Sequence, residues 1–372
     1  MKNKRIAILI NNLSSGGAEK VVRDLVEELS STLNIELICL EKNNFYSINK
    51  NIKVTYLTDK VIQNKLIKLF MIPYWSYKLS KYIKKENIIL MQSHLLFSNY
   101  VSILSKYLFF SKHKNHTVNH TLLSTYYSKT NISTLINKFL IKVLLTKADL
   151  NISVSNIVEQ DYYNLYKAPS EHIVIYNPFN VEKIKRLSKE KIDEFKFDNN
   201  KKYIICVGRL ILLKRHIDII EVMKYLDDNI ELIMLGDGDA RISLLSKVKK
   251  LGLTERIHFL GNVSNPYKFI KNSNILVVTS QSESFSNVII ESFICKTPVI
   301  SSDCGGPREL LKNNCGLIYP IGDKQELQKN IESIVYNKSL ANTLIVNAYE
   351  KSNDFDIKHI IKMYQSITEK DI

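Results

Sequence analysis

The chain has 372 residues, of which 45% are hydrophobic and 24% charged, and this globular composition excludes wholesale disorder. The length predicts two domains, because a single hydrophobic core stops growing near about 250–300 residues. No apolar stretch approaches the roughly 20 residues of a membrane-spanning helix, which excludes an integral membrane protein. The net charge of +15 favours an anionic partner.

The N-terminus and the cysteines indicate a cytosolic protein. The apolar run 6–10 is too short for a signal-peptide core and predicts a first β-strand. The five cysteines are an odd number without a C-x-x-C pair, so we expect reduced thiols and neither a disulfide framework nor a zinc site. They are Cys39, Cys206, Cys295, Cys304 and Cys315.

In the first half, short apolar runs alternate with helical patterns. A small-residue loop, Ser14-Ser15-Gly16-Gly17, precedes an expected helix at 18–29. The expected strands are 6–10, 35–40, 88–91 and 174–176. The charged stretch 182–202 then predicts a connection between domains, and a second alternation starts at 203. Such alternation implies an α/β fold with parallel, doubly wound sheets and ligands at the carboxyl ends of the strands.

The second alternation continues to the end of the chain. Its expected strands are 203–207, 230–235, 257–260, 275–278 and 299–301. Its expected helices lie near 216–226, 241–251, 265–272, 286–295, 323–336, 339–351 and 356–369.

The positive charge is concentrated in residues 60–147. This stretch holds 14 lysines, no arginine and a single acidic residue, Glu86, so it carries +13 of the net +15. It also contains many aromatic residues and amphipathic segments such as KLIKLFMIPYWSYKLSKYIKK. The aromatic residues and one methionine are Phe70, Met71, Tyr74, Trp75, Tyr77, Tyr107, Phe109 and Phe110.

Three interpretations of this basic aromatic face (residues 60–147) remain open. Lysines beside aromatic and aliphatic residues suit a helix on an anionic membrane surface. The face can equally be an ordinary solvated lysine surface. A nucleic-acid site is the least favoured, because such sites prefer arginine for bidentate contacts.

The densest group of polar residues follows the predicted strand 275–278. Glu283 lies in the loop after that strand, and Glu291 lies eight residues later, inside the next helix. The start of that helix offers free backbone N–H groups to an anionic ligand. The Glu291 carboxylate, one turn further on, can accept hydrogen bonds from ribose hydroxyls. Spacing alone would equally fit two surface glutamates.

Two cations follow the predicted strand 203–207. Arg209 and Lys214 lie after its carboxyl end, before a predicted helix. Two such cations can hold a diphosphate and stabilise it as it leaves. Taken separately, each would be an ordinary surface charge.

These motifs resemble a known family. They are Arg209 with Lys214, Gly236-Asp237-Gly238, Glu283 with Glu291, and Gly305-Gly306-Pro307-Arg308-Glu309, supported by Gly16-Gly17-Ala18-Glu19 and Asn177-Pro178. Together they resemble the retaining, group 1 glycosyltransferases of family GT4, of the bacterial surface-polysaccharide type. The resemblance implies the GT-B fold, with two Rossmann-like doubly wound domains facing a central cleft. It implies an acceptor-binding domain at 1–180, a nucleotide-sugar-binding domain at 181–354 and a C-terminal helix, 355–372, crossing back to the first domain.

The resemblance also implies roles for individual residues. Arg209 and Lys214 would bind the donor diphosphate, Glu291 the ribose, and Glu283 the donor sugar. Gly16 and Gly17 would let the first loop approach the reaction centre without a Cβ atom. The backbone expected to cradle the sugar and phosphate is that of Phe285, Ser286, Asn287 and Val288. Many family members have glycine where this chain has Ser284, so the sugar preference can differ.

Two further sequence features concern a metal site and a catalytic histidine. Asp237-Gly238-Asp239 is literally a D-x-D sequence, which binds Mn²⁺ or Mg²⁺ in another glycosyltransferase fold. Its glycines favour a tight turn instead, and the two cations make a metal unnecessary, so we expect none. Family members often place a histidine at the donor sugar, and we assign this role to His120. His94 is a weaker candidate. For both residues, the alternative interpretation is an ordinary hydrogen-bonded histidine without a catalytic role.

The prediction is thus a membrane-peripheral enzyme on the inner face of the plasma membrane. It would move a hexose or N-acetylhexosamine from a nucleotide sugar, with UDP favoured, to a polyprenyl diphosphate-linked saccharide in capsule, O-antigen or related glycan synthesis. No cofactor is expected. Two alternatives are a nucleotide-sugar 2-epimerase of the same fold and a non-catalytic membrane scaffold.

Overall fold

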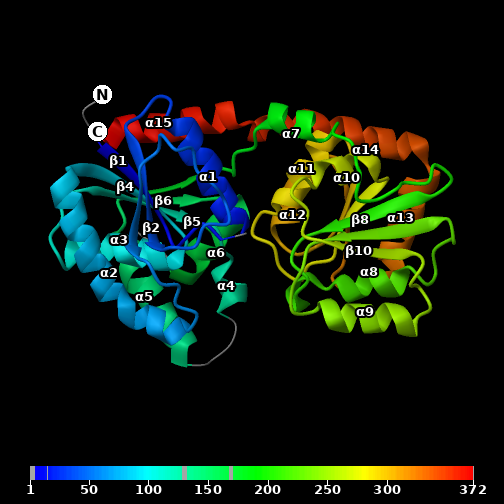
Figure 1. The fold of residues 1–372 in the computed structure, drawn as a ribbon, viewed down its shortest axis with the longest axis horizontal. Coiled ribbons are helices and arrows are strands. Elements are labelled where there is room, and N and C mark those ends of the chain that lie inside the picture. Colours follow the sequence, from blue (N-terminus) through cyan, green and yellow to red (C-terminus); the bar gives the residue numbers. More distant parts are fainter. Residues whose placement is uncertain (1–4, 15, 128–131, 167–170, 372) are drawn as a thin grey trace. The chain divides into compact units, whose positions relative to one another are not determined.

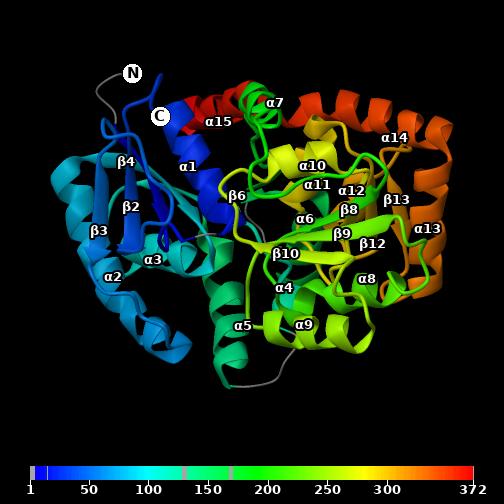
Figure 2. The same ribbon diagram turned by 45° about the vertical axis from the view of Figure 1, so that its right-hand side comes forward.

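The computed structural model describes residues 5–14, 16–127, 132–166 and 171–371. They form two compact units, unit 1 (residues 1–178 and 357–372) and unit 2 (residues 179–356). Each unit is an α/β layer structure around a parallel sheet, which confirms the predicted fold class (Figures 1 and 2). Ser15 of the small-residue loop and residues 128–131 of the basic aromatic face lie outside the described residues.

Unit 1 is built on a seven-stranded sheet in the order β3-β2-β1-β4-β5-β6-β7. The strands are β1 (Arg5–Ile10), β2 (Ile35–Glu41), β3 (Val54–Thr58), β4 (Ile88–His94), β5 (Lys114–Asn119), β6 (Leu150–Ser153) and β7 (Glu171–Val174). The strand order reverses between β1 and β4, so the carboxyl ends of these two strands border the natural ligand crevice of such a sheet.

The helices of unit 1 cover both faces of this sheet. They are α1 (Gly17–Leu29), α2 (Lys65–Glu86), α3 (Leu96–Tyr107), α4 (Leu123–Tyr126), α5 (Ile132–Leu144), η1 (Leu145–Lys147), α6 (Asn156–Tyr166) and α15 (Ile357–Asp371). Helices α1 and α15 lie on one face and α2, α3 and α5 on the other, as right-handed crossovers require (Figure 1). Helix α15 belongs to unit 1, where Gln365 Nε2 donates to Thr32 Oγ1 over 2.7 Å.

Helix α2 runs unbroken through Pro73 and has one buried side. Trp75 is only 1% exposed, and its Nε1 donates to Thr58 Oγ1 over 2.6 Å. Trp75 therefore belongs to the core and not to the exposed basic aromatic face, which corrects the sequence-based expectation. Phe70, in contrast, is 82% exposed on the same helix.

Unit 2 has a six-stranded sheet in the order β10-β9-β8-β11-β12-β13. The strands are β8 (Lys202–Val207), β9 (Ile230–Leu235), β10 (Ile257–Gly261), β11 (Ile275–Val278), β12 (Val299–Ser302) and β13 (Leu317–Tyr319). The helices are α7 (Val181–Leu187), η2 (Leu212–Lys214), α8 (His216–Val222), α9 (Arg241–Lys250), α10 (Tyr267–Asn272), α11 (Asn287–Cys295), α12 (Gly306–Leu310), α13 (Lys324–Tyr336), α14 (Lys338–Lys351) and η3 (Ser352–Phe355). Helices α8 and α9 lie on one face and α10 and α11 on the other (Figures 1 and 2).

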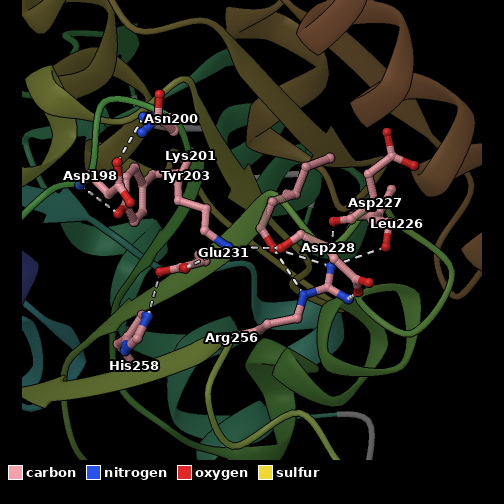
Figure 3. A network of polar contacts seen from close by, with 11 residues as sticks. Asp198, Asn200, Lys201, Tyr203, Leu226, Asp227, Asp228, Glu231, Arg256 and His258 are labelled. Atoms are coloured by element: carbon pink, nitrogen blue, oxygen red, sulfur yellow. Dashed lines mark hydrogen bonds and ion pairs between the residues drawn. The ribbon is translucent and has the colours of Figure 1, made fainter.

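The amino ends of β8, β9 and β10 are tied together by a polar network (Figure 3). Arg256, just before β10, donates to the backbone oxygens of Leu226, Asp227 and Ile230 and pairs with Asp228. Glu231 on β9 accepts from His258 over 2.8 Å. Because ligands of such sheets bind at the opposite, carboxyl edge, this network serves stability.

Most expected elements match the structure, with one clear error. The strand expected at 174–176 is wrong, because β7 pairs residues 171–174 with β6 and ends at Val174. Strands β3, β6 and β13 were not predicted, since each has only three to five residues. All five cysteines are free and buried, as expected. Within the described ranges, none of the helices combines the length and the hydrophobicity needed to cross a bilayer.

Candidate active site

The predicted cations and Glu283 lie in loops that follow the two neighbouring strands at which the strand order of unit 2 reverses. Strands β8 and β11 are neighbours, and the loops after them carry Arg209 with Lys214 and Glu283, respectively. The two loops are bonded to each other: Thr279 Oγ1 donates to the Lys214 carbonyl over 2.6 Å, and Gln281 N to the Leu213 carbonyl over 2.8 Å. The topology thus brings residues about 70 positions apart to one edge of the sheet.

Two glycines allow the loop after β9 to lie against the loop after β8. Gly236 has φ +128°, and a Cβ atom there would lie 2.0 Å from the Gly208 oxygen. Gly238 has φ +157°, and its Cβ would lie 2.5 Å from the Leu210 oxygen. The predicted Gly-Asp-Gly turn is therefore a close backbone contact that excludes any side chain at either glycine.

A third glycine supports the loop after β11. A Cβ atom on Gly306 would lie 2.7 Å from the Phe285 Cα atom. The Glu283 N–H donates to the Cys304 oxygen, and the Gly306 N–H donates to the Glu283 oxygen, both over 2.8 Å. The segment 283–286 is thus held in place through its backbone, so the Glu283 side chain is not needed to hold the loop.

The charged side chains at this edge differ in their partners. Lys214 Nζ lies 2.5 Å from Glu283 Oε1, which also accepts a hydrogen bond from Ser280 Oγ over 2.7 Å. Both bonds go to Oε1, so Oε2 is the oxygen that Glu283 can offer to a ligand. Arg209 is exposed, and its guanidinium forms no ion pair within the described parts of the chain. Arg209 therefore brings an uncompensated positive charge to the site.

The start of α11 carries an unusual serine. Ser286 has φ +74°, is 8% exposed, and its Oγ has no hydrogen-bond partner within the described residues. An unsatisfied buried hydroxyl at a helix N-terminus suits an anionic or hydroxyl-bearing ligand. Glu291 is 7% exposed and lies one turn into the same helix. Val288 and Asn287 are half-buried in its first turn.

The Phe285 side chain does not take part in this ligand surface. It is buried against Phe179, with ring centroids 6.4 Å apart, and against Phe355, at 5.7 Å. Only the backbone of Phe285 is therefore available to a ligand, which is the part that the sequence analysis assigned.

The D-x-D sequence forms the turn that the glycines favour. Asp237 Oδ1 accepts from the Gly238 N–H over 2.8 Å, and Asp237 Oδ2 lies 3.5 Å from Arg241. In the described part of the chain, no group of three or more His, Cys, Asp or Glu side chains is arranged to hold a metal ion.

In unit 1, the predicted residues lie at the carboxyl edge of the sheet. Gly16 precedes α1 as its N-cap, and Gly17 is the first residue of that helix. His120 follows β5, and His94 ends the neighbouring strand β4. The two imidazoles are hydrogen-bonded, with His94 Nδ1 at 3.0 Å from His120 Nε2. Sequence reasoning named both histidines but not their contact.

Burial controls the histidine pKa values in this edge. It lowers the pKa of His120 to about 4 and that of His94 well below its ordinary value, with the neighbouring His120 lowering the latter further. Both imidazoles are therefore neutral at pH 7. His116 on β5 contacts Asp371 on α15, and His113, just before β5, contacts Ser111, so His113, His116 and His120 do not converge.

Sequence reasoning missed Ser280 and Gln92 as members of these two edges, and it assigned Ser286 for its backbone but not for its side-chain hydroxyl. Ser286 is marked only by its place before the helix, and its positive φ is not visible in the sequence. Gln92 Nε2 lies 2.8 Å from His94 Nε2, a contact that follows from their spacing of two along β4, which places both side chains on one face.

Comparison with known proteins identifies both halves of the chain. Residues 188–351 match the model described as glycosyl transferases group 1, and residues 15–183 match glycosyltransferase family 4. A relative from Campylobacter jejuni, N-acetylgalactosamine-N,N'-diacetylbacillosaminyl-diphospho-undecaprenol 4-alpha-N-acetylgalactosaminyltransferase, is 29% identical over 95% of this chain and 96% of its own.

Solved structures of similar fold cover the whole chain. Sucrose-phosphate synthase from Thermosynechococcus elongatus has a TM-score of 0.83 at 20% identity, covering 99% of this chain and 98% of its own. HepE from Anabaena in complex with UDP has a TM-score of 0.80 at 19% identity, covering 100% of both chains. These likenesses support the predicted GT-B fold.

Proposed function

The chain belongs to the group 1 glycosyltransferases of family 4, and on that premise we propose the reaction that it catalyses. It transfers a hexose or N-acetylhexosamine from a nucleotide diphosphate sugar, with UDP as the favoured nucleotide, to a saccharide carried on a polyprenyl diphosphate. The anomeric configuration of the sugar is retained. The observation that carries this proposal is the uncompensated charge of Arg209, in the same loop as Lys214, together with the unsatisfied Ser286 hydroxyl before α11.

The donor diphosphate occupies the loops of unit 2. Arg209 and Lys214 bind its oxygens, and the backbone N–H groups at the start of α11 with Ser286 Oγ add uncharged donors. As the bond between the sugar and the diphosphate breaks, negative charge grows on the leaving oxygen. The two cations stabilise that charge, so the step proceeds without a metal ion.

The two glutamates orient the rest of the donor. Glu291 accepts hydrogen bonds from the ribose hydroxyls, and Glu283 Oε2 accepts one from a sugar hydroxyl. Lys214 holds the Glu283 carboxylate through Oε1, so its orientation is set before the ligand arrives. The acceptor hydroxyl attacks from the face that the diphosphate leaves, and a leaving phosphate oxygen takes its proton. In unit 1, Gly16 and Gly17 leave room for the substrates, and His120 donates a hydrogen bond to a substrate oxygen.

A lipid-linked acceptor fits two observations. The related C. jejuni enzyme is named for an undecaprenol-linked saccharide. The basic aromatic face of unit 1 exposes apolar side chains among its lysines, as a protein resting on an anionic bilayer requires. On α2 and the loop after α3 these are Leu66, Ile67, Phe70, Tyr74, Tyr77, Tyr107, Leu108 and Phe110, and on α5 they are Leu135, Ile136, Phe139 and Val143. We therefore place the enzyme on the cytoplasmic leaflet of the plasma membrane.

The reaction is tested by mixing the enzyme with UDP-hexoses, UDP-N-acetylhexosamines and a short saccharide on a polyprenyl diphosphate. We expect transfer that persists in EDTA, and an NMR spectrum of the product with the donor's anomeric configuration. Inversion of that configuration would refute the retaining mechanism. Conversion of the donor without any acceptor would favour the 2-epimerase alternative.

The membrane contact is tested with sedimented vesicles. Binding to phosphatidylglycerol vesicles should exceed binding to phosphatidylcholine vesicles and should fall in salt. A Phe70→Ser, Phe139→Ser double variant should lose binding. The matched control is Ile242→Ser on α9 of unit 2, since Ile242 is as exposed as Phe70, at 82%. Equal loss of vesicle binding in both variants would contradict a membrane contact made by the basic aromatic face.

A further inference from the structure

Three side chains of unit 1 form a line of hydrogen bonds at the carboxyl edge of the sheet. Gln92 and His94 lie two positions apart on β4 and so share one face of the strand. Gln92 Nε2 lies 2.8 Å from His94 Nε2, and His94 Nδ1 lies 3.0 Å from His120 Nε2. The line therefore runs from Gln92 inside the fold to His120, whose own Nδ1 has no partner among the described residues.

The first two members of this line are buried, and the third, His120, is more exposed. His94 is 0% exposed and Gln92 is 3% exposed, whereas His120 is half-buried. Burial lowers the pKa of both histidines, and His120 is the titratable group that further lowers the pKa of His94. Each ring is thus neutral and carries a single N–H proton.

The amide nitrogen of Gln92 decides where these protons reside. An amide nitrogen donates and does not accept, so His94 Nε2 must be the acceptor. The proton of His94 then lies on Nδ1, which donates to His120 Nε2. His120 Nε2 is therefore occupied as an acceptor, and the remaining proton of His120 lies on Nδ1.

We propose that Gln92 and His94 are positioning residues that fix His120 as the Nδ1–H tautomer, so that His120 serves the transfer as a neutral hydrogen-bond donor to a substrate oxygen. This inference rests on the proposed function of His120 as a substrate-contacting residue. It assigns His120 to substrate orientation and to stabilising charge on a sugar or phosphate oxygen, and not to removing the acceptor proton.

A contrast with His116 on β5 supports this assignment. His116 Nε2 lies 2.7 Å from the Asp371 carboxylate, whose charge raises the pKa of His116 and so opposes the larger lowering caused by burial. The His94–His120 pair ends in an amide instead. An amide fixes the ring orientation without adding negative charge. This keeps His120 a neutral donor, whereas a general base would be helped by a carboxylate partner.

The tautomer is measured by long-range proton–nitrogen NMR of the ¹⁵N-histidine-labelled protein at pH 7.5, with the His120 signals assigned from a His120→Gln variant. We expect a pyrrole-type Nδ1 and a pyridine-type Nε2 for His120. The reverse pattern would overturn the proposal, because the Gln92 oxygen would then face His94 and leave His120 Nδ1 as an acceptor. This measurement needs no substrate, so its failure is distinct from a failure of the proposed reaction.

A charge-bearing variant tests whether the line serves the reaction. In Gln92→Glu, the carboxylate accepts from His94 Nε2, which reverses both tautomers and leaves His120 Nδ1 without its proton. We expect kcat/KM to fall about 10–100-fold, as for partners that orient ligating histidines, with donor binding by unit 2 unchanged. The matched control is His359→Gln on α15, an exposed histidine of the same unit, which should alter neither signal nor rate. Reversed tautomers with an unchanged rate would overturn the proposal.

Discussion

The two units build the carboxyl edges of their sheets by different means. In unit 2, loops are held against one another by backbone hydrogen bonds and by glycines such as Gly236 and Gly306, whose missing side chains permit the contact. In unit 1, the edge is held by side chains that bond to each other, such as Glu41 with Lys68 and His94 with His120.

This difference determines which changes each edge tolerates. A backbone-built edge survives the loss of a surface side chain but not the addition of a Cβ atom. An edge built from side chains fails when one buried partner is removed, because the other is left unsatisfied. The predictions below test this contrast, from the largest expected effect to the smallest.

The strongest test in unit 2 adds one carbon atom. Gly236→Ala places a Cβ 2.0 Å from the Gly208 oxygen, so the loops after β8 and β9 must separate. We expect a loss on the order of 3–5 kcal/mol in unfolding free energy, measured by urea denaturation. Gly252→Ala is the control, because Gly252 also has a positive φ, +71°, but no atom lies within 4 Å of the added Cβ. It should cost only about 1–2 kcal/mol, and equal losses would contradict the close-contact explanation.

Removing a charge from the same edge should affect rate but not stability. Arg209→Ala should lower kcat about 10²–10³-fold, since a cation at the leaving group is lost. The melting temperature should remain unchanged, because Arg209 is exposed and forms no ion pair within the described residues. Arg256→Ala should instead lower the melting temperature and leave kcat unchanged, because Arg256 binds three backbone carbonyls in the network of Figure 3. A destabilised Arg209→Ala variant with normal kcat would refute the assignment.

In unit 1, breaking a buried pair should be costly. Glu41 is 1% exposed and accepts from Lys68 Nζ over 2.9 Å. Lys68→Met keeps the length of the side chain but leaves the carboxylate without its cation, and we expect a loss of about 2 kcal/mol after allowing for the partial exposure of Lys68. Lys191→Met is the control, because its pair with Asp193 is largely solvated and should contribute less than about 1 kcal/mol.

Acid should destabilise unit 1 more than unit 2. Burial is the leading cause of the lowered pKa in His94, His113, His116, His120 and His172 of unit 1, whereas in unit 2 it lowers that of His216. Their contribution to stability is present above pH 6.5 and is lost as the pH falls towards 4, because the unfolded chain binds protons first.

At pH 5.5, each histidine with a folded pKa of about 4, such as His113 or His216, should lower the free energy of unfolding by about 1 kcal/mol. Hydrogen exchange at pH 7.5 and 5.5, corrected for intrinsic rates, should show protection lost first in strands β4 to β6. Earlier loss in β8 and β9 would contradict this order.

Unit 2 was the easier unit to predict from sequence. Its glycines, Arg209, Lys214 and the two glutamates lie in short local motifs, and its central strands β8, β9, β11 and β12 are mostly apolar. What the sequence could not supply is the conformation of Ser286, since a left-handed serine depends on how the loop is held by Gly306.

Unit 1 was harder because its edge depends on pairing between distant segments. The contact between His94 and His120 requires the register of β4 against β5, which joins residues 26 positions apart. Similarly, Trp75 and Phe70 look alike in an amphipathic helix, and only packing against Thr58 on β3 shows that one is buried.

The most direct test of the central claim is the binding of nucleotides to unit 2. We would measure the thermal stability of the full chain with UDP, GDP and ADP, and repeat it with Arg209→Ala and Glu291→Ala. The account predicts stabilisation by one nucleotide, UDP, of about 2.7 kcal/mol at 100 times its dissociation constant, and its loss in both variants. Stabilisation that survives in both variants, or none with any nucleotide, would contradict it.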